Sequence, residues 1–144
     1  MQKLILFNLD NRPFGLDVTA VQEILSQVTA RQIPHAAEYI QGLFDFRGKI
    51  IPLLNLRALL SFAITSNGGN VIVVNHQGIS LGLIVDKVLA VITDQEQIKY
   101  LEQKSSPNPF IQCFVEYRDQ EVAILNLAQL AAIIADEEEK SDVS

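Results

Sequence analysis

The sequence contains a single cysteine, Cys113, and no tryptophan. One cysteine cannot form a disulfide within the chain, and it cannot supply the several thiolates of a cysteine-based metal cluster. Cys113 lies in the apolar run of residues 110–115. Thiols in such runs are usually buried and inert, so we predict a structural cysteine rather than a nucleophile.

Long apolar stretches are also missing. No segment approaches the ~18 consecutive apolar residues that a membrane-spanning helix needs. The N-terminal residues reach Asn8 and Asp10 too early for a secretory signal peptide, and they carry no small-residue cleavage site. The sequence therefore favours a cytoplasmic location without direct membrane insertion.

Positive charge is scarce and scattered. The chain carries 11 Lys and Arg against 17 Asp and Glu, a formal net charge of −6. Five acidic residues against Lys140 place −4 of this within residues 136–144, so residues 1–135 carry only −2. A body this close to neutral lacks the basic surface that attracts phosphate backbones or anionic lipids. We predict no nucleic-acid partner, and we interpret residues 136–144 as a disordered acidic tail.

Recognisable catalytic motifs are absent from the sequence. His35 and His76 are 41 residues apart, and neither has a second histidine or a cysteine at ligand spacing. There is no Gly-x-Ser-x-Gly elbow, no phosphate-binding loop and no glycine-rich dinucleotide fingerprint. We therefore predict a protein that is not an enzyme and needs no cofactor or metal.

What the sequence does contain is a series of short apolar segments separated by turn residues, which predicts a mostly β fold. Strands are expected at 4–9, 44–56 with a tight turn at Gly48, 71–75, 79–85, 88–92, 110–117 and 121–125. Asp17 is a candidate N-cap of a further element. Residues 65–70, rich in Gly and Asn, form a break, and short helical turns are expected at 35–42 and 56–60. An amphipathic C-terminal helix is predicted by the apolar stripe Leu127, Leu130, Ala131 and Ile134.

Two blocks of sequence recur in the same order. Residues 15–24 match residues 82–91, and residues 53–59 match residues 124–130. The offsets, 67 and 71 residues, are nearly equal, as a duplication requires, and too long for a solenoid repeat. Asn55 and Asn126 each end an apolar strand and are candidate caps of the helical turn that follows. The repeat predicts two small similar barrels or sheets built by internal duplication.

One charged cluster lies at a predicted turn. Arg47 and Lys49 flank Gly48 between two apolar strands. Charges pointing to water at the tip of an ordinary hairpin explain this pattern equally well. The functional interpretation is an arginine held on a rigid turn, from which its planar guanidinium contacts a protein partner.

Four pieces of sequence occur in a recognisable order: Phe14-Gly15-Leu16-Asp17-Val18, Arg47-Gly48-x-Ile50-x-Pro52-Leu53, Gly82-Leu83-Ile84-Val85-Asp86 and Leu125-Asn126-Leu127. With them the chain resembles the CheW domain family from about residue 4 to residue 134. The resemblance implies two SH3-like five-stranded β-barrels packed together, with short helices and a C-terminal helix. It implies one domain over residues 1–135, with halves at roughly 1–65 and 70–135 whose strands are free to interleave.

The same resemblance implies an adaptor of chemotaxis-type signal transduction, which couples chemoreceptors to a CheA-type histidine kinase without chemistry of its own. The implied partners are the kinase's regulatory domain and the cytoplasmic tip of a methyl-accepting chemoreceptor, docked on different faces. Carried over by position, Arg47 and Gly48 belong to the turn that shapes the partner surfaces, with Val21, Glu23 and Phe46 near them. Apolar positions between the barrels would offer a groove for a receptor helix.

The chain departs from the usual family pattern at a few positions. Asp45-Phe46 precedes Arg47-Gly48 where the family usually has Asn-Leu, and Asn55 stands where an Asp is common. These changes leave the partners open. Two alternatives are an adaptor of a non-flagellar chemosensory system, such as one that controls twitching motility, and a nucleic-acid-binding small β-barrel protein.

Overall fold

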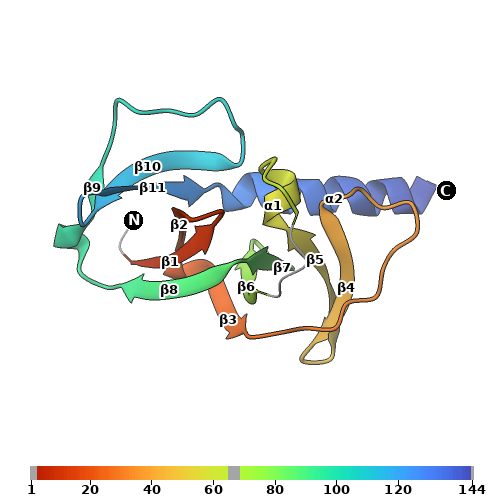
Figure 1. The fold of residues 1–144 in the computed structure, drawn as a ribbon. Coiled ribbons are helices and arrows are strands. Elements are labelled where there is room, and N and C mark those ends of the chain that lie inside the picture. The colour runs from red at the N-terminus through yellow and green to blue at the C-terminus, as the bar shows by residue number, and fades with distance from the viewer. Residues whose placement is uncertain (1–2, 65–68, 144) are drawn as a thin grey trace.

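The computed structural model describes residues 3–64 and 69–143, and within these ranges it contains eleven strands in two sheets (Figure 1). The sheet at the left of Figure 1 is termed sheet A and has the strand order β8-β1-β2-β11-β10-β9. Its strands are β1 (Leu4–Leu9), β2 (Arg12–Asp17), β8 (Lys87–Ile92), β9 (Lys99–Tyr100), β10 (Ile111–Tyr117) and β11 (Gln120–Leu125).

The other sheet, sheet B, has the strand order β3-β6-β7-β5-β4. Its strands are β3 (Val21–Leu25), β4 (Ile40–Phe46), β5 (Lys49–Asn55), β6 (Asn70–His76) and β7 (Ile79–Val85). The described helices are η1 (Val18–Ala20), α1 (Leu56–Leu59), η2 (Gln95–Gln97) and α2 (Leu127–Val143). The predicted mostly β fold with two subdomains is confirmed, and sheet A has a sixth strand, the two-residue β9, beyond the five expected.

The two sheets are built by exchange between the copies of the repeat. In sheet A, β2 from the first copy runs parallel to β11 from the second, with Gly15 opposite Ile124. In sheet B, β7 from the second copy runs parallel to β5 from the first, with Gly82 opposite Leu53. The recurring sequence blocks are therefore direct neighbours, and each sheet contains a hairpin of each copy.

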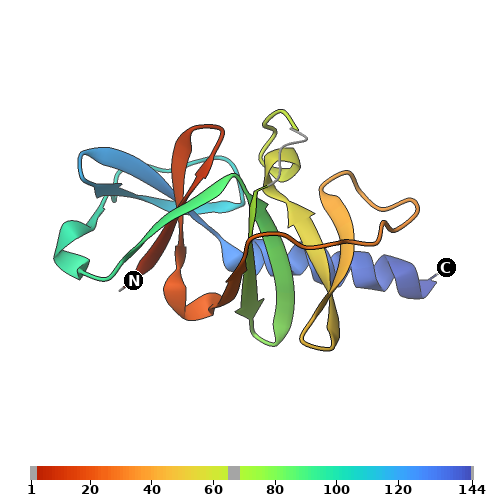
Figure 2. The same ribbon diagram turned by 60° about the horizontal axis from the view of Figure 1, so that its bottom comes forward.

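The predicted division into halves at about 1–65 and 70–135 does not coincide with the sheets. Sheet B takes a continuous stretch of chain from β3 to β7, whereas sheet A unites β1 and β2 with the strands from β8 to β11. The chain passes from sheet A to sheet B through η1 and returns after Val85 (Figure 2). The strands of the two halves interleave in both sheets because hairpins β1–β2 and β6–β7 each join the other copy's partner.

The largest cluster of buried apolar side chains lies between the sheets. It draws on β1, β2 and β11 of sheet A, on β5, β6 and β7 of sheet B, and on α2. Separate clusters fill the interior of sheet A and the interior of sheet B. In β1, Leu4 and Leu6 face the sheet A interior, while Ile5, Phe7 and Leu9 face the central cluster. A strand buried on both faces reads as a continuous apolar run, which is why β1 shows no alternation.

The predicted caps are present. The side-chain oxygen of Asn55 accepts a hydrogen bond from the backbone N–H of Ala58 at 3.3 Å. That of Asn126 accepts one from the N–H of Gln129 at 3.2 Å. Asp17 caps η1 by accepting from a backbone N–H of its first turn. These side chains satisfy amide groups that the helix geometry leaves without partners.

The predicted helical turn at 35–42 is wrong. His35 has a positive φ of +64°, and strand β4 begins at Ile40. A left-handed residue directly after Pro34 stops a helix from starting there. Gly42 belongs to β4, where a Cβ atom would come within 2.4 Å of the backbone oxygen of Arg31, which pairs with this strand. Close approach of two backbones, rather than a helix, explains this glycine.

The C-terminal stripe is confirmed, but the helix is longer than predicted. Leu130, Ala131 and Ile134 are buried against the central cluster or beside it. Residues 136–143, predicted as a disordered acidic tail, continue α2 to Val143. The segment includes three consecutive Glu and one Lys, residue types of high helix propensity, so a helix started by packing continues through it. Residues 65–68 of the predicted break lie outside the described residues.

The exchanged pairing makes a prediction about the two repeat-related glycines. A Cβ atom at Gly82 would lie 2.7 Å from the ring of Phe44, whereas at Gly15 it would lie 2.9 Å from the terminal methyl of Ile124. A packed ring cannot move as a methyl can, so we expect Gly82→Ala to lower the free energy of unfolding by about 1–3 kcal/mol. Gly15→Ala should cost less. Urea denaturation of both variants checks this, and equal costs would contradict it.

Candidate protein-binding surfaces

The turn between β4 and β5 is a tight two-residue loop formed by Arg47 and Gly48. Both residues have positive φ, +53° and +80°, as hairpin turns that match the twist of the strands require. The backbone N–H of Gly48 donates to the carboxylate of Asp45 at 2.8 Å, which closes the loop. Gly48 makes the left-handed conformation easy at the second position, whereas Arg47 adopts it at some cost. The loop therefore presents Arg47 on a backbone with little freedom.

Arg47 is oriented by two neighbours. Its guanidinium forms an ion pair and hydrogen bond with Glu23 of β3 and lies 5.1 Å from the ring centre of Phe46. The Arg47 side chain is still 67% exposed, compared with 33% for Glu23. An exposed ion pair adds little stability. The pair restricts the accessible Arg47 side chain to fewer rotamers.

The structure brings together four of the five predicted site residues. Arg47, Gly48, Phe46 and Glu23 meet where the β4–β5 turn approaches β3, the opposite edge of sheet B. Phe46 is largely buried in the sheet B interior. Val21 begins β3, pairs with Val74 and packs partly buried against the central cluster, so its role here is to anchor the strand.

A second surface consists of exposed apolar side chains on two edge strands. Ile24 of β3 is 41% exposed, and Leu89 and Val91 of β8 are 43% and 49% exposed. Each strand pairs on one side only: β3 with β6, and β8 with β1. We term these three residues the β3–β8 face. Ile24 and Val91 are also equivalent positions of the repeat, so the face is contributed by both copies.

The two edge strands meet at the start of β6. Leu25 at the end of β3 pairs with Val71, and the backbone N–H of Val88 in β8 donates to the side chain of Asn70 at 2.8 Å. Asn70 thus links the beginning of β8 to sheet B. In Figure 1 both strands run along the lower side of the molecule, where the two sheets adjoin. The family resemblance implies apolar positions between the barrels, and these edge strands adjoin that junction.

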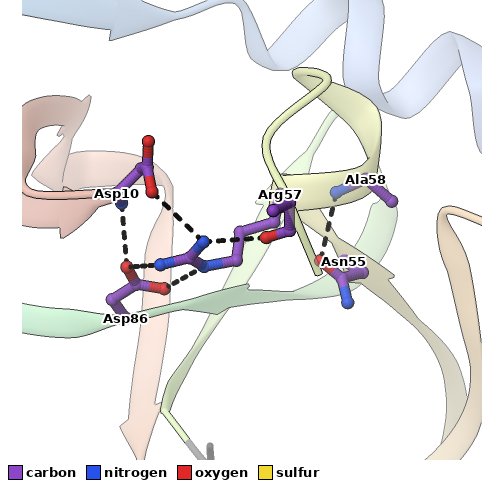
Figure 3. Close-up of polar contacts among 6 residues, drawn as sticks. Asp10, Asn55, Arg57, Ala58 and Asp86 are labelled. Carbon is purple, nitrogen blue, oxygen red and sulfur yellow. Dashed lines mark hydrogen bonds and ion pairs between the residues drawn. The ribbon is translucent and has the colours of Figure 1, made fainter. Parts of the chain in front are cut away.

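A polar cluster around Arg57 of α1 was not predicted as a site (Figure 3). The guanidinium binds both carboxylate oxygens of Asp86, from Nε at 2.8 Å and from Nη2 at 2.5 Å. Its Nη1 donates to the backbone oxygen of Ala63 at 2.8 Å and lies 3.5 Å from the carboxylate of Asp10. The carboxylate of Asp86 also accepts from the backbone N–H of Asp10 at 2.8 Å. Sequence signals exist, since Arg57 follows a cap and both aspartates end predicted strands, but the three lie up to 76 positions apart.

This cluster shifts the ionisation of its members. Burial raises the pKa of Asp86, but hydrogen bonds from Arg57 and the backbone of Asp10, together with the Arg57 charge, outweigh this and leave the pKa lowered. The hydrogen bond with Asp86 raises the pKa of Arg57. Both groups are therefore ionised at neutral pH, and the Arg57 side chain, only 14% exposed, depends on its acidic partners.

The histidines and the cysteine, which could act as metal ligands or nucleophiles, do not form a cluster. His35 lies in a turn and His76 ends β6, and no group of three or more His, Cys, Asp and Glu within residues 3–64 and 69–143 could hold a metal ion. Cys113 is half-buried against the sheet A interior, and burial raises the pKa of its thiol. Across the same ranges, no helix has the length and apolar character to cross a membrane.

Comparison with known proteins shows one family. The family model described as CheW-like domain matches residues 3–135. Chemotaxis protein CheW of Treponema pallidum (strain Nichols) is 34% identical over 104 residues, which cover 67% of this chain and 61% of that protein. Chemotaxis protein CheW of Bacillus subtilis (strain 168) is 27% identical over 149 residues, which cover 99% of this chain and 92% of that protein. The match thus spans less than two thirds of the Treponema relative.

A solved structure has the same architecture. The scaffolding protein TtCheW from Thermoanaerobacter tengcongensis superimposes with a TM-score of 0.77 at 29% sequence identity. The superposition covers 87% of this chain and 88% of that chain. The arrangement of two subdomains is therefore shared almost throughout.

The Arg57 cluster makes a prediction about stability. Arg57→Gln removes the bidentate ion pair and leaves Asp86 partly buried without its cation. We therefore expect the free energy of unfolding to fall by about 1–3 kcal/mol. Lys104→Gln, which breaks the more exposed pair of Lys104 with Glu121, is the matched control and should cost under about 1 kcal/mol. Urea denaturation at pH 7 measures both.

The lowered pKa of Asp86 predicts a pH dependence. In the unfolded chain an aspartate has a pKa of about 3.9. In the folded protein the pKa of Asp86 lies below that value. Ionised Asp86 therefore stabilises the fold fully above about pH 4–5, and this contribution is lost as the pH falls through the folded pKa. Asp86→Asn should lower stability at pH 7 and flatten the fall in stability below about pH 4. A variant with the unchanged wild-type slope would refute the assignment.

Proposed function

This chain belongs to the CheW-like domain family, and from that premise we propose that it is a non-catalytic adaptor coupling chemoreceptors to a CheA-type histidine kinase. The observation that carries the proposal is the family match over residues 3–135. The shared architecture with a protein described as a scaffolding protein supports it. So does the presence of two exposed surfaces of different chemistry, the polar Arg47 turn and the apolar β3–β8 face, because an adaptor must bind two partners at once.

The Arg47 turn is the surface we assign to the kinase's regulatory domain. Arg47 is exposed, yet it is held by Glu23, Phe46 and a tight turn. Arginine is enriched at binding hot spots because its planar fork makes several directed hydrogen bonds. Prior ordering of the side chain reduces the conformational entropy that binding would otherwise cost. These properties suit an anchor residue better than a solvated hairpin tip.

The β3–β8 face is the surface we assign to the receptor's cytoplasmic tip. Three large apolar side chains lie exposed on two neighbouring strands near the junction of the sheets. Receptor tips are helical, and an amphipathic helix binds by laying its apolar stripe against exposed apolar side chains of its partner. Exposed large apolar side chains on unpaired strand edges are candidates for covering by a partner. The adaptor then acts in the cytoplasm, where kinase and receptor tip meet.

A direct experiment tests the adaptor role. The tagged protein should co-purify with a CheA-type kinase and with a receptor cytoplasmic fragment from the same cell, and all three should co-elute in gel filtration. Addition of this chain to the kinase or to the receptor fragment should produce no new enzymatic activity. Absence of binding to every histidine kinase and receptor of that cell would overturn the proposal.

Arg47 and its repeat equivalent make a matched pair of variants. Arg118 occupies the corresponding turn, has a φ of +49° and lies 5.2 Å from the ring of Tyr117, but no ion pair is found for it among the described residues. We expect Arg47→Ala to weaken kinase binding by about 1–2 kcal/mol, roughly ten-fold. Arg118→Ala should leave it nearly unchanged. Calorimetry with the isolated regulatory domain distinguishes the two, and equal effects would remove Arg47 from the site.

The β3–β8 face is tested by placing a charge in it. Val91→Asp would bury an unpaired carboxylate under a docked helix, so receptor binding should weaken by about 2 kcal/mol or more. Ile33→Asp, at another exposed apolar position (38%), is the control and should bind the receptor fragment normally. Kinase binding of Val91→Asp should persist if the two surfaces are separate. Unimpaired receptor binding by Val91→Asp would show that the helix docks elsewhere.

A further inference from the structure

Arg57 lies where the chain crosses from one sheet to the other. Asp86 follows the last residue of β7 in sheet B and precedes the first residue of β8 in sheet A. Its backbone N–H donates to the oxygen of Asn8 in β1 at 3.0 Å, so the crossover is attached to sheet A. Arg57 belongs to α1, which follows β5 and packs on sheet B. The bonds from Arg57 to Asp86 and Asp10 therefore connect the two sheets.

Within residues 3–64 and 69–143, no ion pair occurs at the repeat-related place on the other side. By the offsets of the repeat, the position equivalent to Arg57 is Ala128 and the position equivalent to Asp86 is Thr19. Neither can form the corresponding ion pair. Thr19 and Ala128 instead line an open hollow of about 710 Å³, together with His76. The duplicated fold thus has the Arg57–Asp86 ion pair on one side and open space at the equivalent place on the other.

The sheets are held by apolar burial and by directed polar contacts, which include the bond from the N–H of Val88 to Asn70 as well as the Arg57 cluster. The central apolar cluster holds the sheets together, but burial of apolar area is non-directional and tolerates small rotations. The pair of Arg57 with Asp86 is bidentate, and such pairs add geometric specificity to their energy. A directed contact at a crossover selects one orientation among those that the core allows.

We propose that Arg57 is a positioning residue that sets the angle between the two sheets and thereby the spacing of β3 and β8. Ile24 is held by the pairing of β3 with β6 in sheet B, whereas Leu89 and Val91 follow the crossover within a few residues. The distance between the two halves of the β3–β8 face then depends on where β8 leaves sheet B. This inference rests on the proposed function, because it takes that face as the receptor's docking site.

The first measurement reports orientation without any partner. Spin labels at Lys49→Cys on sheet B and Gln120→Cys on sheet A, both exposed positions, in a Cys113→Ser background, give an inter-sheet distance distribution. We expect Arg57→Gln to broaden or shift this distribution, Arg57→Lys to restore it in part, and Lys104→Gln to leave it as in the wild type. A lysine keeps the positive charge but cannot form the bidentate pair with the carboxylate of Asp86.

The second measurement reports binding of a soluble receptor cytoplasmic fragment and of the kinase regulatory domain. If Arg57→Gln lowers the fraction of molecules with the binding-competent angle to about one tenth, the apparent affinity for the receptor falls about ten-fold. Kinase binding at the Arg47 turn, which lies within sheet B, should change less than two-fold. A merely destabilised fold would weaken both partners together or neither.

The outcomes separate this inference from the proposed function. An unchanged distance distribution and unchanged receptor affinity in Arg57→Gln overturn the positioning role. Wild-type protein that binds neither partner overturns the adaptor function, while the distance measurement still decides the role of Arg57 in orientation. If Arg57→Gln does not fold, Asp86→Asn breaks the bidentate ion pair with a side chain of the same shape, leaves the contacts of Arg57 with Asp10 and Ala63 in place, and carries the test.

Discussion

The parallel contact between strands of different copies is the constraint on which the rest of the structure depends. Gly15 faces Ile124 in sheet A and Gly82 faces Leu53 in sheet B, so neither sheet can be completed by one copy alone. The absence of a Cβ at each glycine lets a side chain of the neighbouring strand or hairpin occupy the space above it. Exchange at these two positions pairs a strand near the start of the chain with one near its end, and pairs two mid-chain strands with each other.

Several features of the molecule follow from this exchange. Because β1 joins the second copy's strands, it is buried on both faces, and the central cluster forms between the sheets. Because β3 and β8 are the strands by which the chain leaves each exchanged hairpin, both become edge strands near the junction. The exposed apolar side chains of the β3–β8 face and the crossover fastened by Arg57 are consequences of the same topology. The binding surfaces are therefore properties of the paired copies rather than of either barrel.

Local features were predictable where neighbouring residues determine them. The strands, the asparagine caps and the apolar stripe of α2 depend on patterns within a few positions, and the structure has them. The turn at Gly48 was predictable for the same reason, since a tight hairpin needs left-handed residues. The helical turn predicted at 35–42 failed because contact with Arg31, not local propensity, decides the conformation around Gly42. The Arg57 cluster was missed because its bonds join positions 10, 57 and 86, and no local pattern links them.

By itself the sequence determined that this protein is a small, mostly β, internally duplicated chain with an arginine at a hairpin tip, and its similarity to one family. These are matters of periodicity, turn chemistry and recurrence, all of which are written along the chain. Only the tertiary structure decided that the copies exchange hairpins, that Glu23 orients Arg47, and that Arg57 fastens one side of the sheet junction. The physical reason is that a repeat specifies which strands are alike but not which of two equivalent partners each strand pairs with, and that choice is made by packing in three dimensions.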